Sequence, residues 1–151
     1  MSVLTVGETM ALLDPVDEGE PVQGARFQLR IAGAESNLAV ALVRLGVRVA
    51  WVSRVGEDAF GRLVADTLAR EGLDLQWLRP DPSAPTGLFF KLRSAGRTSV
   101  VYYRRGSAAS HLRREDVPDR ALDGVRLVHL TGITMALSET ARDLVVDVAH
   151  R

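Results

Sequence analysis

The sequence turns at Ile31-Ala32-Gly33-Ala34-Glu35-Ser36-Asn37, which leads directly into the apolar run Leu38–Leu45 and stops at Gly46. A glycine allows a ligand to approach the backbone N–H groups at a helix start, where the positive end of the helix dipole lies. The polar side chains beside it can cap the helix or bind hydroxyl groups. The stretch therefore predicts a helix from about Glu35 to Leu45, and its N-terminus is either a ligand site or an ordinary capped helix start.

Strand-like and helical patterns alternate on both sides of this turn. Buried strands are predicted at 3–6, 48–53 and 126–130, and further helices at 58–71 and from 139 onward. Asp58 and Ser138 are placed to cap the two later helices, and Gly72 to end the first of them. Residues 79–85 read as irregular and 116–122 as a short helix, with a charged, solvent-exposed start at Arg113–Asp116. Strands that alternate with helices are typical of a parallel α/β sheet.

Two inserted stretches have a different pattern. Residues 26–31 alternate polar and apolar side chains, and the β-rich runs 86–93 and 98–104 flank Ser94-Ala95-Gly96-Arg97, a hairpin signal. We expect these stretches, about 11–31 and 86–105, to be two antiparallel pieces that make a small second layer, which we call the β-lid. The sheet looks unfinished, because the last predicted helix reaches Arg151 with no strand after it.

Composition excludes several classes of function. The 151 residues, enough for one domain, carry 19 basic and 19 acidic side chains, so the charge gives no footprint for nucleic acid or an anionic membrane. No segment has the apolar length of a membrane span, and the N-terminus lacks a basic leader. The absence of cysteine suits a reducing cytosol, and the three scattered histidines have no metal-ligand spacing.

Four motifs carry a resemblance to a known family. Gly33-Ala34-Glu35-Ser36-Asn37 and Val55-Gly56-Glu57-Asp58-Ala59-Phe60-Gly61 resemble the N-terminal half of the ribokinase-like (PfkB) carbohydrate kinases. Tyr102-Tyr103-Arg104-Arg105-Gly106-Ser107-Ala108 and His129-Leu130-Thr131-Gly132-Ile133-Thr134 are similar to the 2-keto-3-deoxygluconate kinases within it. The match runs along nearly the whole chain, in the right order and spacing.

The resemblance implies a partial doubly wound parallel sheet, a β-lid and the sugar-binding half of a kinase. In the family the catalytic aspartate belongs to a Gly-Ala-Gly-Asp segment near the end of a chain about twice this length, and nothing in this sequence matches that segment. The full enzyme would use ATP and Mg²⁺ to phosphorylate a keto-sugar acid. We expect this chain alone to bind neither cofactor and to have no kinase activity.

Around the turn, the resemblance implies substrate-binding roles for Glu8, Gly33, Ala34 and Asn37. Gly33 would let the backbone approach the sugar, Asn37 would bond two hydroxyls, and Glu8 would accept from another. The alternatives are a steric turn for Gly33 and a helix cap for Asn37.

In the lid, Arg104 is the strongest candidate, because a guanidinium binds a carboxylate through two parallel hydrogen bonds. Its alternative is an ordinary surface arginine. Tyr102 would share a strand face with Arg104 and supply an aromatic wall. Phe89 would face either the pocket or the core, and Ile133 would line the site or pack in the core. Arg105 and Ser107 are weaker candidates.

These residues predict a sugar kinase half of the 2-keto-3-deoxygluconate type. A sugar-acid binding or regulatory module without catalysis is one alternative, and a kinase for fructose or a nucleoside is another. A homo-oligomer formed through the β-lid is also expected, since related lids pair between subunits and an open sheet edge favours association.

Overall fold

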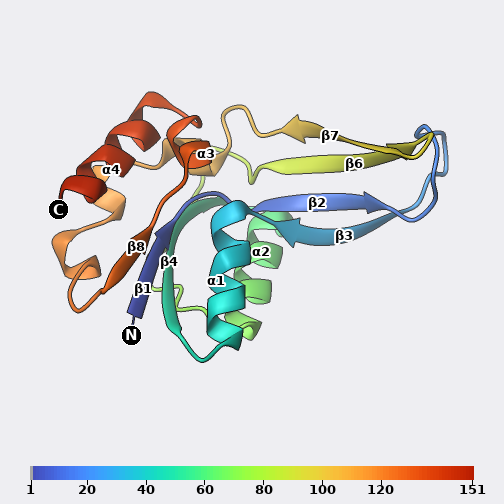
Figure 1. Ribbon diagram of the computed structural model, residues 1–151. Coiled ribbons are helices and arrows are strands. Elements are labelled where there is room, and N and C mark those ends of the chain that lie inside the picture. Colours follow the sequence, from blue (N-terminus) through green and yellow to red (C-terminus); the bar gives the residue numbers. More distant parts are fainter. Residues whose placement is uncertain (1) are drawn as a thin grey trace.

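The computed structural model describes residues 2–151 and contains a parallel sheet with a second sheet projecting from it (Figure 1). The parallel sheet has the strand order β5-β4-β1-β8, and β1 pairs in parallel with both β4 and β8. Its strands are β1 (Ser2–Val6), β4 (Arg48–Gly56), β5 (Leu78–Asp81) and β8 (Leu127–His129). The predicted α/β architecture is therefore confirmed.

Helices and short turns cover both faces of the parallel sheet. Alternate side chains of β1 and β4 point to opposite faces, so Val3 and Trp51 pack with α1 and α2, whereas Leu4 and Val52 pack with α4. The elements of the first layer are α1 (Ala34–Arg44) and α2 (Ala59–Arg70). Those of the second are α4 (Glu139–His150) and the 3₁₀ turns Ala108–His111, Arg114–Asp116 and Asp119–Ala121.

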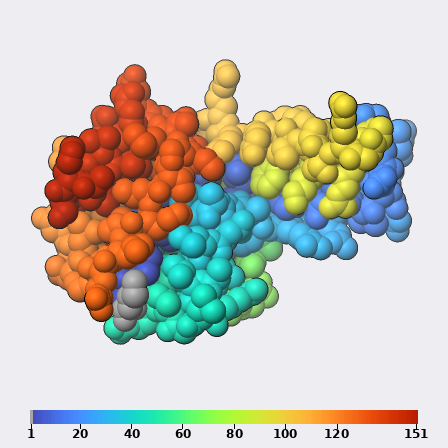
Figure 2. Space-filling model, in the orientation of Figure 1, coloured from blue at the N-terminus to red at the C-terminus, as the bar shows by residue number. Residues whose placement is uncertain are grey.

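The second sheet is the β-lid, with the strand order β3-β2-β6-β7. Its strands are β2 (Met10–Pro15), β3 (Phe27–Ala32), β6 (Leu88–Ser94) and β7 (Arg97–Tyr103). They come from the two stretches in which the sequence predicts lid pieces. The lid extends as an arm from the α/β body in both the ribbon and the space-filling view (Figure 2).

Helix starts follow the predicted caps. The Asp58 carboxylate accepts a hydrogen bond from the Gly61 N–H, and Ser138 Oγ accepts one from the Ala141 N–H. A short helix that the sequence reading missed, α3 (Gly132–Met135), follows β8, and the Thr131 hydroxyl caps it. No helix in residues 2–151 has the length and apolar character needed to cross a membrane.

Three local predictions are wrong. Residues 78–81 form strand β5 despite Pro80, because β5 is an edge strand and a proline at an edge need not break the pairing with β4. The short helix predicted at 116–122 is replaced by 3₁₀ turns separated by Pro118, whose ring lacks a backbone donor. Asp116, predicted to lie in a solvated helix start, is fully buried because Arg54 pairs with it.

Candidate functional site

A cavity of about 160 Å³ lies where the carboxyl end of β1, the start of α1, the lid and α3 meet. All eight residues singled out from the sequence line it: Glu8, Gly33, Ala34, Asn37, Phe89, Tyr102, Arg104 and Ile133. Met10, Ala32 and Glu35, which the sequence reading did not single out, complete the lining. In open α/β sheets, ligands bind beyond the carboxyl ends of the strands, and this cavity lies at that edge.

The backbone at Gly33 lies so close to the segment after β1 that a side chain would not fit between them. Its φ of −163° is ordinary extended backbone, but a Cβ at this position would lie 2.3 Å from the Glu8 carbonyl oxygen. Gly33 is the N-cap of α1, and no side chain caps the helix. The exposed Asn37 side chain has no hydrogen-bond partner within residues 2–151, so the alternative role of helix cap is excluded for it.

A buried charge pair closes the cavity on the lid side. Glu8 is 3% exposed, and its Oε2 lies 2.5 Å from a terminal nitrogen of the Arg104 guanidinium. The Ser107 hydroxyl donates to Glu8 Oε1 at 2.5 Å. Burial raises the pKa of the Glu8 carboxyl, although the Ser107 hydrogen bond and the Arg104 charge act in the opposite direction. Ser107, a weaker candidate from sequence, thus supports the site from outside the cavity.

Aromatic side chains form the wall beside this pair. The Tyr102 ring packs against Phe89, with 5.5 Å between centroids, and the Arg104 guanidinium carbon lies 5.6 Å from the Tyr102 centroid. The prediction that Tyr102 and Arg104 share one face is confirmed. Phe89 combines its two predicted roles, because it lines the cavity and is also only 7% exposed within a small core cluster.

The sequence reading missed the second buried carboxylate, Glu35. Its Oε1 accepts hydrogen bonds from the hydroxyls of Thr131, at 2.5 Å, and Thr134, at 2.7 Å. Thr134 Oγ1 also lies 3.3 Å from the Val6 carbonyl oxygen, so the start of α1, the end of β1 and the start of α3 are tied together. This arrangement presents Ile133, which is 48% exposed, to the cavity.

Glu35 needs room as well as partners. A Cβ on Gly7 would lie 2.2 Å from the Glu35 carboxyl carbon, so any other residue after β1 would displace the Glu35 carboxylate. An acidic residue in the first turn of an apolar helix looks like a dipole or capping residue in the sequence. The sequence signal for the position of Glu35 was its two hydroxyl partners, Thr131 and Thr134. No local pattern predicts that these threonines lie close to Glu35.

A second ion-pair group anchors the loop that follows the lid. Arg54 binds Asp116 through two nitrogens, at 2.8 and 3.0 Å, and lies 3.4 Å from Asp81. The Ser83 hydroxyl and N–H, with His111 Nδ1 at 2.9 Å, hold the pKa of Asp81 well below its usual range. Because this group fixes residues 107–116 to β4 and β5, it holds the segment that carries Ser107.

The chemistry of the cavity suits a small polyhydroxy anion. It offers an exposed amide, a cation with an aromatic neighbour and backbone at a helix N-terminus. Residues 2–151 contain no group of three His, Cys, Asp or Glu side chains able to hold a metal ion.

Comparisons with known proteins show which family the chain resembles. The chain is 38% identical over 144 residues to the 2-dehydro-3-deoxygluconokinase of Thermoproteus tenax, covering 93% of this chain and 44% of that protein. It is 37% identical over 152 residues to the enzyme of the same name from Bacillus subtilis, covering 99% and 47%. A sugar kinase from Pyrococcus horikoshii solved in complex with ATP is similar in structure, with a TM-score of 0.87, 26% identity, and coverage of 97% and 48%.

The chain therefore spans about half the length of the curated relatives it matches. The family model described as pfkB family carbohydrate kinase matches residues 1–150. The sequence motifs, the parallel sheet with its lid and this match lead to one conclusion: the chain belongs to the pfkB family of carbohydrate kinases.

Proposed function

We propose that this chain is the sugar-binding half of a kinase that phosphorylates a keto-sugar acid of the 2-dehydro-3-deoxygluconate type. The observation that carries the proposal is the Arg104 guanidinium, which lines the cavity opposite the start of α1. A neutral sugar offers such a cation only hydroxyl acceptors, whereas the carboxylate of a sugar acid matches its charge and its paired donors. The names of the two similar curated enzymes support the same class of substrate.

In this proposal the residues of the chain bind and orient the sugar. Arg104 holds the carboxylate, Asn37 and the backbone at Gly33 hold hydroxyls, and Phe89 and Tyr102 exclude water from one side. Fixing the acceptor hydroxyl in this way supplies the positioning that phosphoryl transfer needs. The role predicted for Glu8, accepting a hydrogen bond from a sugar hydroxyl, is not part of this proposal. Both of its carboxylate oxygens already contact protein groups, the Ser107 hydroxyl and the Arg104 guanidinium.

ATP would be the phosphoryl donor, as the ATP complex of the similar sugar kinase supports, and Mg²⁺ would neutralise the phosphates. The proposal assigns both to residues outside this chain, and it places the protein in the cytoplasm, the compartment that supplies ATP. A coupled assay of ATP consumption tests this division. The 151-residue chain should give no turnover, and robust turnover would contradict the proposal.

Isothermal titration calorimetry tests the substrate class. The chain should bind 2-dehydro-3-deoxygluconate more tightly than fructose or a nucleoside. Arg104→Ala should weaken binding of the acid by about 30-fold or more, since a buried charge partner is lost, and should leave fructose binding unchanged. Arg104→Lys is the matched control, because lysine keeps the positive charge but lacks the planar guanidinium. Its affinity for the acid should fall between those of the unchanged chain and the Arg104→Ala variant.

Equal affinity of the Arg104→Ala variant for the acid would sink the carboxylate assignment. Tighter binding of fructose or a nucleoside by the unchanged chain would redirect the proposal to that sugar. Binding of the acid by a longer form of the protein that never consumes ATP would favour the alternative of a regulatory module.

We also propose that a second copy of the chain covers the outer face of the β-lid. One row across its four strands is entirely apolar: Leu29, Leu13, Phe90 and Val101 are paired in register, and Leu29 and Val101 are 50% and 39% exposed. An exposed apolar face of this kind marks an association surface. Sedimentation velocity should show a dimer that Leu29→Glu dissociates, and a monomeric parent chain would contradict it.

A further inference from the structure

Two buried polar atoms at the edge of the cavity lack hydrogen-bond partners. Of the atoms in residues 2–151, Arg104 Nε and Glu8 Oε2 are both buried without one, although Oε2 lies in ionic contact with a terminal nitrogen of Arg104. An unpaired buried donor costs about 1–3 kcal/mol, so Arg104 Nε favours a ligand that satisfies it, whereas Glu8 Oε2 is held by the Arg104 charge. Arg104 Nε can donate to an oxygen of an entering sugar acid. Glu8 Oε2, as a carboxylate oxygen, can only accept.

The charges around Glu8 conflict with an entering anion. Before binding, Glu8 and Arg104 form a neutral pair, and the other charged group that faces Glu8 is the buried Glu35 of α1. Ser107, from the loop after the lid, contributes a hydroxyl, and Tyr102 of β7 lies on the far side of Arg104. A sugar carboxylate on Arg104 would place two negative groups on one guanidinium in a low-dielectric site, an arrangement that favours protonation of one of them.

Glu8 is the group suited to take that proton. It is already held in a buried position, whereas the sugar carboxylate keeps the freshly formed bonds to Arg104. A protonated Oε2 becomes a donor, so it can hydrogen-bond to the sugar carboxylate instead of repelling it. The same proton therefore removes the like-charge repulsion and joins the two carboxyl groups by a hydrogen bond.

We propose that an anionic sugar enters this site together with one proton from solvent, which is held on Glu8 Oε2. The inference rests on the proposed function, because it needs a sugar acid on Arg104. A neutral sugar brings no charge and takes up no proton. The site thus distinguishes acids from neutral sugars by proton linkage as well as by Arg104.

Calorimetry in two buffers counts the protons. The chain is titrated with 2-dehydro-3-deoxygluconate at pH 7.5 in phosphate and in Tris, whose different ionisation enthalpies reveal proton exchange with the buffer. The expected result is uptake approaching one proton for the acid and none for fructose. By linkage, the affinity for the acid should fall by about tenfold for each unit of pH increase over the range where uptake is complete.

Glu8→Gln is the matched variant, because its amide N–H₂ mimics the donor of the protonated carboxyl. It should bind the acid without proton uptake and with an affinity that does not change between pH 7 and 8.5. Binding of the acid to the unchanged chain with no proton uptake would overturn the inference and leave the proposed function standing. Failure of the acid to bind at all would overturn both, so the two failures are distinguishable.

Discussion

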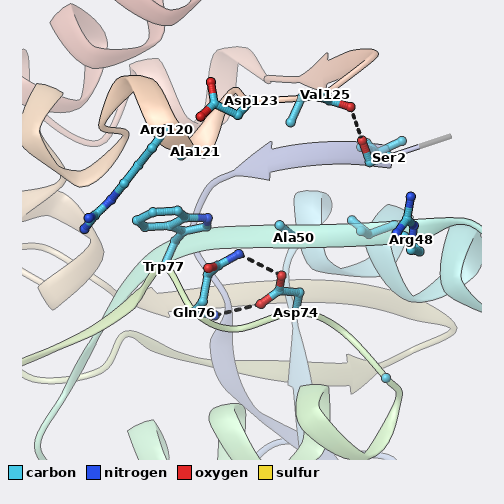
Figure 3. Close-up of a pocket in the computed structure, with 14 residues that line it drawn as sticks. Ser2, Arg48, Ala50, Asp74, Gln76, Trp77, Arg120, Ala121, Asp123 and Val125 are labelled. Carbon is cyan, nitrogen blue, oxygen red and sulfur yellow. Dashed lines mark hydrogen bonds between the residues drawn. The ribbon is translucent and has the colours of Figure 1, made fainter.

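Cavities lie at both edges of the parallel sheet, and their size does not decide which one is the better candidate for function. At the amino edge, a cavity of about 410 Å³ is lined by Arg48, Asp74, Gln76, Trp77 and Arg120 among others (Figure 3). At the carboxyl edge, the cavity beside Glu8 measures about 160 Å³, and a cavity of about 530 Å³ that shares Tyr102, Arg104 and Ile133 adjoins it. The two edges differ in how their polar groups are held.

At the amino edge the charged side chains are exposed to solvent. Gln76 bonds to Asp74, two residues away, and the guanidinium carbon of Arg120 lies 5.3 Å from the Trp77 ring centroid. At the carboxyl edge, Glu8 and Glu35 are nearly or fully buried and are bound by residues far away in the sequence. Burying a carboxylate costs free energy unless the carboxylate is paired. The buried and paired carboxylates at the carboxyl edge therefore favour that edge as the functional site.

Among variants at the two edges, a substitution of Arg54 should lower the free energy of unfolding most. Arg54→Ala would leave Asp116 buried at 0% exposure without its main partner, which should lower the free energy of unfolding by about 3–5 kcal/mol. Arg48→Ala, an exposed arginine on the same strand at the amino edge, is the control and should change it by less than about 0.5 kcal/mol. Urea denaturation measures both variants. Equal effects would remove the distinction between the two edges.

A smaller effect is expected from Glu35. Glu35→Ala removes the common acceptor of the Thr131 and Thr134 hydroxyls, which should cost about 1.5–3 kcal/mol of unfolding free energy and weaken binding of the acid sugar. Glu35→Gln keeps an acceptor oxygen and should lose less on both counts. Thermal unfolding and calorimetry give the two readouts. If alanine and glutamine behave alike, the threonine contacts are not what holds this wall of the cavity.

The smallest effect should come from the amino-edge cavity. Arg120→Ala removes an exposed cation–aromatic contact with Trp77, worth about 0.5–1 kcal/mol. Binding of 2-dehydro-3-deoxygluconate should be unchanged, because the variant lies at the opposite edge of the sheet. A loss of affinity in this variant would indicate that the amino edge takes part in binding and would weaken the comparison.

Sequence alone predicted what depends on local patterns. The caps at Asp58 and Ser138, the strand alternation and the hairpin around Gly96 all follow from spacing of a few residues. The period of two correctly placed Tyr102 and Arg104 on one face. Family resemblance supplied the rest of the candidate residues, because their meeting at one cavity depends on the topology of the sheet and lid.

What the sequence could not predict depends on pairs of charges distant along the chain. Asp116 looked solvated because its neighbours Arg113, Arg114 and Glu115 are charged and exposed, and only the fold brings Arg54 to it. Glu8 looked free to bind a hydroxyl until the lid returned Arg104 to it. In both positions burial and pairing are tertiary properties.

The central claim is that the carboxyl edge, and not the amino-edge cavity, binds an acidic sugar. Titration of the ¹⁵N-labelled chain with 2-dehydro-3-deoxygluconate, followed by amide chemical shifts, tests it most directly. The account predicts shifts concentrated at Gly33–Asn37 and Tyr102–Arg104. Shifts concentrated at Asp74–Trp77, or none at saturating ligand, would contradict it.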